Sequence, residues 1–239
     1  MIKPAHGSGG EGILVISECA NCKFRKADGL FMTAEELNHH LFNLLSGLYS
    51  LGGQPDTALI EYRVQFDPLF EQISYQGVPD IRIIAFLCVP VMSMVRLPTR
   101  MSNGKANLHQ GAIGAGIDLA TGATFAGVWN GEVTVQHPDT GNPVSGLRIP
   151  EWEKLLEMAA KCCEITGLGY QGVDIVLDRD KGPLLLEINA RPGLNIQIAN
   201  NAGLLPRLNL VERHHEQLTS VAARVAFARE HFRAEDRLG

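Results

Sequence analysis

One stretch of the chain, residues 172–195, constrains the fold more than any other. It reads GVDIVLDRDKGPLLLEINARPGLN and opens with an apolar run rich in β-branched residues, 173–177. A polar turn follows at 178–182, and a second apolar run covers 184–188 before Pro192 ends the pattern. Two such runs joined by a short polar loop containing glycine predict an antiparallel β-hairpin.

The hairpin predicts which side chains face one another. If Asp178 pairs with Pro183 across the loop, Asp174 lies opposite Glu187, and Asn189 points to the same face as Glu187. Like charges directly opposite each other destabilise a sheet. Carboxylate and amide oxygens are the ligands that Mg²⁺ takes, so the pattern favours a metal site. The alternative is an ordinary solvated sheet face.

This segment closely resembles the metal-binding hairpin of ATP-grasp ligases, and most of all that of RimK-type glutamate ligases. The resemblance implies that Asp174, Glu187 and Asn189 hold two Mg²⁺ ions, or Mn²⁺ in their place, against ATP. D-alanine–D-alanine ligases carry an arginine where this chain has Gly172. That difference favours the glutamate-ligase branch.

The N-terminus contains a glycine-rich loop, residues 7–12, preceded by Lys3. Glycines let backbone N–H groups approach phosphate oxygens, and a lysine adds a point charge. A purely structural hairpin tip is the alternative, and the spacing does not fit a Walker loop. Beside the metal hairpin, the segment resembles the flexible loop of the ATP-grasp lid. The loop residues expected to bind nucleotide are Gly7, Ser8, Gly9, Gly10 and Gly12.

The order of the predicted elements divides the chain into a lid and a larger domain. Strand, glycine loop, strand, helix and strand predict a small α/β lid over residues 1–60, followed by a nucleotide- and metal-binding domain over 61–239. By resemblance, Glu61 and Tyr62 at the hinge contact the adenine. Edge-strand residues without a ligand are the alternative.

Residues 80–111 supply further candidates for the phosphate site. Asp80 matches a family aspartate associated with the nucleotide, and Arg82 carries a charged fork suited to phosphate. Pro90 is expected to separate the two strands of a hairpin in this region. In the polar segment that follows, Lys105 stands where RimK-type enzymes have arginine, and Asn107 matches their asparagine.

Arg82, Lys105 and Arg191 are the predicted catalytic residues. Arg191 lies two positions after Asn189, so it is expected to face the transferred phosphoryl group or the acid substrate.

Composition excludes several classes of protein. The net charge is −5 and the sequence pI is about 5.9, which argues against sequence-independent nucleic-acid binding. No apolar run approaches the ~18 residues of a membrane span, and no signal peptide is visible. Five cysteines, an odd number, do not suggest a disulfide framework, so a reducing cytoplasm is expected.

The sequence therefore predicts a mixed α/β (α+β) chain with an ATP-grasp fold. By resemblance, it ligates a carboxylate substrate to an amine acceptor, an amino acid or peptide, through an acyl phosphate. A nucleotide-binding regulatory module without turnover and an ATP-dependent phosphotransferase remain alternatives. Related ligases carry an additional N-terminal domain, so the chain is also expected to be N-terminally incomplete, with a frayed first strand and little activity alone.

Overall fold

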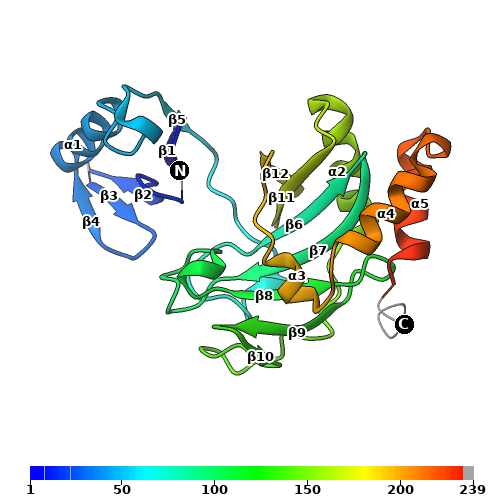
Figure 1. Cartoon of the computed structure of the whole chain (residues 1–239). Helices are drawn as coiled ribbons and strands as arrows, with labels where there is room; N and C mark the ends of the chain where they lie inside the picture. Colours follow the sequence, from blue (N-terminus) through cyan, green and yellow to red (C-terminus); the bar gives the residue numbers. More distant parts are fainter. Residues whose placement is uncertain (8, 22, 234–239) are drawn as a thin grey trace. The chain divides into compact units, whose positions relative to one another are not determined.

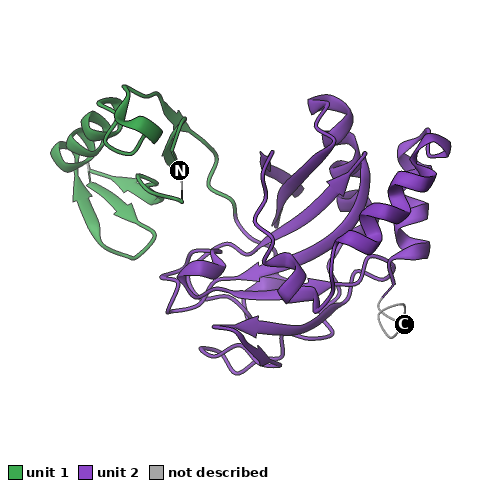
Figure 2. Ribbon diagram, in the orientation of Figure 1, with its two compact units in different colours: residues 1–64 green, residues 65–239 purple. Residues whose placement is uncertain are grey.

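The computed structural model describes residues 1–7, 9–21 and 23–233. The chain forms two compact units, Met1–Val64 and Gln65–Gly239 (Figures 1 and 2). Each unit has a hydrophobic core of its own and is described by itself.

Unit 1 surrounds a small core of Ile2, Leu14 and Leu44. A capping box formed by Thr33 and Glu36 begins its helix, because each residue satisfies a backbone N–H of the other. The elements are β1 (Ile2–Pro4), β2 (Ile16–Ala20), β3 (Lys23–Lys26), β4 (Phe31–Thr33), α1 (Ala34–Leu45), the 3₁₀ helix η1 (Leu51–Gly53) and β5 (Ala58–Ile60). β1 pairs with β5, and β2, β3 and β4 form an antiparallel sheet.

The first strand is not frayed, contrary to the expectation. On one side Ile2 pairs with Ile60, and on the other it exchanges two backbone hydrogen bonds of 2.8 Å with Leu14. The Ile2 residue is only 7% exposed. Pairing on both sides and burial of this side chain hold the strand.

Unit 2 is built on a seven-stranded antiparallel sheet in the order β10-β9-β8-β7-β6-β11-β12. Its strands are β6 (Asp80–Phe86), β7 (Val89–Leu97), β8 (Ile113–Ile117), β9 (Thr124–Trp129), β10 (Glu132–Thr134), β11 (Tyr170–Asp178) and β12 (Gly182–Asn189). The helices are η2 (Pro68–Phe70), η3 (Leu108–Gln110), α2 (Trp152–Thr166), α3 (Ile196–Asn200), α4 (Leu205–His214), η4 (His215–Gln217) and α5 (Val221–His231). None of the helices in the described part of the chain has the length and apolar character that a bilayer crossing requires.

Helices pack on both faces of this sheet. Gln171 of β11 accepts a 2.8 Å hydrogen bond from Thr166 of α2, so α2 lies on the face to which Gln171 points. On the other face α3 approaches β8 at Gly116, where a Cβ atom would lie only 2.7 Å from Asn200 Oδ1. The absence of a side chain at this position lets the helix pack closely on the strand.

The β11–β12 hairpin has the predicted facing pair and an unpredicted irregularity. Asp174 lies opposite Glu187, as the alternation predicts. The prediction for the turn is wrong, because Asp178 pairs with Gly182 rather than with Pro183. A bulge between Asp174 and Ile175 in the ladder takes up the difference of one residue.

The β6–β7 hairpin turns at Leu87 and Cys88, whose φ values of 45° and 65° form a tight two-residue connection. Pro90 does not separate the strands; it lies within β7, paired with Ala85. β7 pairs with β8 only from Ser93 onward, so the missing N–H of Pro90 costs no ladder bond on that side.

Two of the cysteines form a disulfide, contrary to the expectation. Cys88 at this turn is bonded to Cys163 on α2, with 5.1 Å between their Cα atoms. The two residues are 75 positions apart in sequence, and only the packing of α2 against the hairpin brings them together. Cys162 is buried and free, and Cys19 is exposed and free. The cysteines therefore no longer support the argument for a reducing compartment.

Candidate functional site

The three predicted metal ligands converge on one face of the β11–β12 hairpin. Asp174 is fully buried, and Glu187 lies opposite it on the edge strand. The side-chain amide of Asn189 donates to Asp174 Oδ2 at 3.3 Å and to Glu187 Oε1 at 3.0 Å. A half-turn of this amide exchanges its nitrogen for its oxygen, so all three side chains can offer oxygen atoms to one ion.

Two arginines hold Asp174 from the neighbouring strands. Arg82 on β6, directly opposite Asp174, donates through Nε at 2.7 Å and through an Nη atom at 2.5 Å. Arg96 on β7 donates at 2.8 Å to Asp174 and makes two bonds of 2.5 Å to Asp80. Asp80, Arg82, Arg96 and Asp174 therefore form a continuous ladder of alternating charge, which is called the charge ladder below.

Burial and mutual attraction determine the ionisation of this ladder. Burial alone would raise the pKa of Asp174, but the hydrogen bond from Arg82 and the charges of Arg96 and Arg82 outweigh it, so the pKa is lowered. At Asp80 burial prevails over the charge of Arg96 and raises the pKa to about 6. Burial lowers the pKa of Arg96, but the two carboxylates more than compensate and raise it. Asp174 and Arg96 are therefore ionised at neutral pH.

The side chains at the hairpin offer the kind of oxygen atoms that a hard divalent cation prefers. Within the part of the chain that the structure describes, no cluster of three or more His, Cys, Asp or Glu side chains could hold a metal. The hairpin offers two carboxylates and an amide instead. Mg²⁺ typically takes one or two protein carboxylates and completes its shell with water and phosphate oxygens.

Arg96 is a candidate site residue that the sequence analysis missed. Its side chain is only 13% exposed and bridges two carboxylates. The sequence of β7 contained a signal, because a charged residue on a strand whose other side chains, apart from Ser93, are apolar needs a buried partner. Pairing β6 with β7 places Arg96 opposite Asp80.

Three other predicted site residues of unit 2, two of them predicted to be catalytic, do not join the charge ladder. Lys105 is exposed on the loop before η3. Asn107 is the N-cap of η3, where its side chain accepts from the backbone N–H of His109 at 3.0 Å. Arg191 is exposed beyond the end of β12. Their roles toward a nucleotide remain predictions.

In unit 1 the structure joins two predicted nucleotide residues to each other. Lys3 Nζ lies 2.7 Å from Glu61 Oε1, with the two side chains 22% and 39% exposed. Tyr62 follows Glu61 and is 43% exposed. A phosphate and Glu61 would therefore compete for the ammonium group of Lys3.

The glycine-rich loop has the backbone conformation that glycine permits. Gly9, Gly10 and Gly12 have φ values of 64°, 77° and 72°, in the left-handed region. Gly7 forms a bridge with Ser50 at the start of the loop. Ser8 lies outside the described residues, so its predicted role in nucleotide binding stays a prediction.

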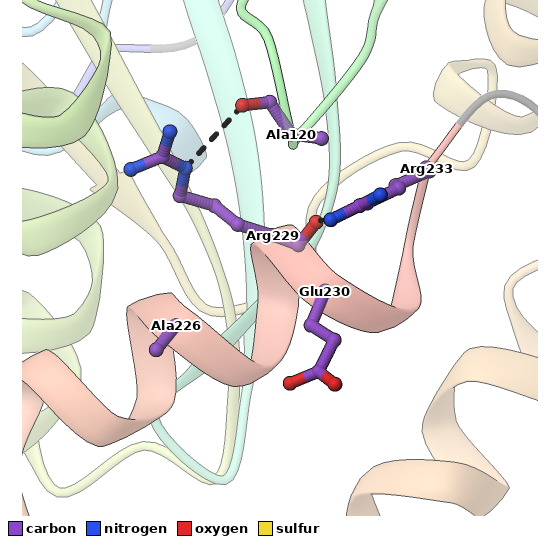
Figure 3. A pocket seen from close by; sticks show the side chains of 5 residues that line it. All are labelled: Ala120, Ala226, Arg229, Glu230 and Arg233. Carbon is purple, nitrogen blue, oxygen red and sulfur yellow. Dashed lines mark hydrogen bonds between the residues drawn. The ribbon is translucent and has the colours of Figure 1, made fainter.

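A shallow hollow of about 330 Å³ lies elsewhere in unit 2, against α5 (Figure 3). Its lining residues are Ala120, Ala226, Arg229, Glu230 and Arg233. Arg229 is held by the carbonyl of Ala120 at 3.3 Å and by Glu153 at 3.0 Å, and Glu230 points away from Arg229 in this view. None of the predicted site residues lines it.

A mixed α/β chain with a large antiparallel sheet, an Asp–Glu–Asn hairpin and a glycine-rich loop has the features of an ATP-grasp protein. A family model described as "Sugar-transfer associated ATP-grasp" matches residues 1–213, and the chain belongs to this family. A comparison with curated proteins finds no match. The predicted membership of the ATP-grasp superfamily is confirmed, and the glutamate-ligase branch within it stays a prediction.

Proposed function

We propose that this chain is an ATP-dependent carboxylate–amine ligase that works through an acyl phosphate. The observation that carries the proposal is the meeting of Asp174, Glu187 and Asn189 beside the charge ladder. Buried carboxylates held between fixed positive charges suit a site where phosphate charge is bound and transferred.

The proposed reaction has two steps. A carboxylate oxygen of the acid attacks the γ-phosphorus of ATP, which forms an acyl phosphate and releases ADP. The nitrogen of the amine then attacks the acyl carbon, forms an amide, loses a proton and releases phosphate. Asp174, Glu187 and Asn189 would hold Mg²⁺, whose charge offsets that of the phosphates when it is bound. Arg82 and Arg96 keep Asp174 ionised and fixed in orientation.

Two classes of amine acceptor are supported. Resemblance to the glutamate ligases supports glutamate or a short peptide. The family description, which names sugar transfer, supports an amino sugar. Both classes offer a primary amine to an activated acid.

The experiment that tests the proposal measures ADP release with Mg·ATP and a panel of carboxylic acids, with glutamate, peptides or amino sugars as acceptors. Mass spectrometry identifies the product, and Glu187→Gln serves as the control for the metal-dependent reaction. An amide and one ADP per amide support the ligase. A phosphate ester would identify a phosphotransferase instead, and nucleotide binding without any turnover would identify a regulatory module.

A further inference from the structure

A histidine is held in a fixed orientation at the start of the glycine-rich loop. The Nδ1 atom of His6 lies 2.8 Å from Oδ1 of Asp56, and the His6 backbone N–H donates to Oδ2 at 3.0 Å. Ser50 donates its hydroxyl to the same Oδ2 at 2.6 Å, and the Thr57 N–H donates to Oδ1 at 2.7 Å. Four donors therefore surround one carboxylate.

These contacts determine which ring nitrogen of His6 carries a hydrogen. The Asp56 side chain is fully covered, and its hydrogen bonds, that from Ser50 foremost, lower its pKa against the opposing effect of burial. An ionised carboxylate only accepts, so Nδ1 of His6 is the donor. The His6 side chain is 76% exposed, which leaves Nε2 at its accessible end.

His6 also lines a hollow of about 430 Å³ in unit 1, together with Gly7, Ser50, Leu51, Gln54 and Pro55. His6 is the one titratable side chain in this lining. Its carbonyl accepts from the Leu51 N–H at 3.0 Å, and Gly7 is bridged to Ser50, so the backbone is anchored here. The volume lies within the usual range of small-molecule sites, roughly 300–1,000 Å³.

We propose that His6 is an anion ligand that contacts a phosphate oxygen of Mg·ATP beside the glycine-rich loop, with Asp56 as its positioning residue. The proposal rests on the proposed function, in which the chain binds Mg·ATP. When the ring carries both protons, Nδ1 donates to Asp56 and Nε2 donates to the phosphate. The bond to Asp56 fixes the direction of Nε2 in advance, which reduces the entropy lost on binding.

The test compares Mg·ATP binding to the full chain by isothermal titration calorimetry. His6→Gln is expected to weaken binding about tenfold, as loss of a charge-assisted hydrogen bond predicts. His39→Gln, which changes an exposed histidine on α1, is the matched control and should bind as the wild type does. Asp56→Asn, which keeps the side-chain volume but removes the charge, should show an intermediate loss.

A second measurement needs no variant. Two-bond ¹⁵N–¹H spectra of the wild type should show a hydrogen on His6 Nδ1 and a shift of Nε2 on addition of Mg·ATP. Equal affinity of His6→Gln and the wild type, or an unchanged Nε2 signal at saturating Mg·ATP, would overturn the role of His6 while leaving the ligase proposal intact. No binding of Mg·ATP by the wild type would overturn both.

Discussion

Replacement of Arg96 by methionine is expected to destabilise unit 2 strongly at neutral pH. The change keeps much of the apolar stem but removes three hydrogen bonds, two to Asp80 and one to Asp174. The Asp80 and Asp174 side chains are only 8% and 1% exposed, so solvent cannot replace the lost guanidinium. Removing one partner from a buried ion pair typically costs ~3–5 kcal/mol.

The response of Asp80 limits this cost and makes it depend on pH. Without Arg96, Asp80 can avoid a buried charge by taking up a proton. From an unfolded pKa of about 3.9, protonation costs ~4 kcal/mol at pH 7 and ~1.5 kcal/mol at pH 5. A carboxyl whose folded pKa is raised contributes its stability at low pH and loses it as pH rises. Wild-type Asp80, whose pKa is about 6, already carries ~3 kcal/mol of this cost at pH 7 and nearly all of it at pH 5. The loss in Arg96→Met should therefore be ~3–5 kcal/mol near pH 7 and ~1.5 kcal/mol smaller near pH 5.

Urea unfolding followed by tryptophan fluorescence measures this loss, because the chain's two tryptophans, Trp129 and Trp152, both lie in unit 2. Asp80→Asn combined with Arg96→Met removes both charges and should recover at least ~2 kcal/mol at pH 7. Arg100→Met is the matched control: Arg100 is 74% exposed, and its loss should cost less than ~1 kcal/mol. A loss below ~1 kcal/mol in Arg96→Met, or the same loss at pH 5 and pH 7, would refute the reasoning.

Glu187→Gln should change the free energy of unfolding by less than ~1 kcal/mol, because it relieves the repulsion between Glu187 and Asp174. In calorimetry the same change should weaken ATP binding at least tenfold, and only when Mg²⁺ is present. Asp56→Asn should lower the thermal stability of unit 1 at neutral pH. The difference should begin to shrink as pH falls below about 4, the pKa of the unfolded carboxyl, and should vanish only at the lowered pKa of folded Asp56, because the folded carboxylate stays ionised over that interval; NMR melting curves of unit 1 that keep a constant difference down to pH 2 would contradict this. Cys88→Ser should lower the urea stability of unit 2 by ~2–4 kcal/mol, and a reductant should bring the wild type to the same value; a wild type insensitive to reductant would contradict the disulfide's contribution.

Local pattern was sufficient for the parts of the site that depend on strand alternation. Asp174 and Glu187 face each other as two-residue periodicity predicts, but only because the bulge between Asp174 and Ile175 offsets the one-residue difference at the turn. Arg96 was missed because its partners lie on other strands, and its placement needs the β6–β7 register. The disulfide from Cys88 depends on how a helix packs across a hairpin, which no local pattern encodes.

Contacts between side chains that lie far apart in the sequence could not be predicted from local pattern either. Lys3 and Glu61 were each expected to bind nucleotide, but they pair because β1 and β5 are neighbours. The anchoring of His6 by Asp56 joins residues 50 positions apart in the same way. Sequence reasoning therefore found candidate ligands and omitted the groups that hold them.

The bulge in the β11–β12 hairpin has a consequence for comparing this chain with its relatives. A loop one residue longer without a bulge, and the observed turn with a bulge, both bring Asp174 opposite Glu187. Homologous hairpins can therefore differ by one residue in the turn and still present the same two carboxylates to a ligand. An alignment anchored on the turn would shift the second carboxylate onto the wrong strand position, whereas one anchored on side-chain faces would keep it in place.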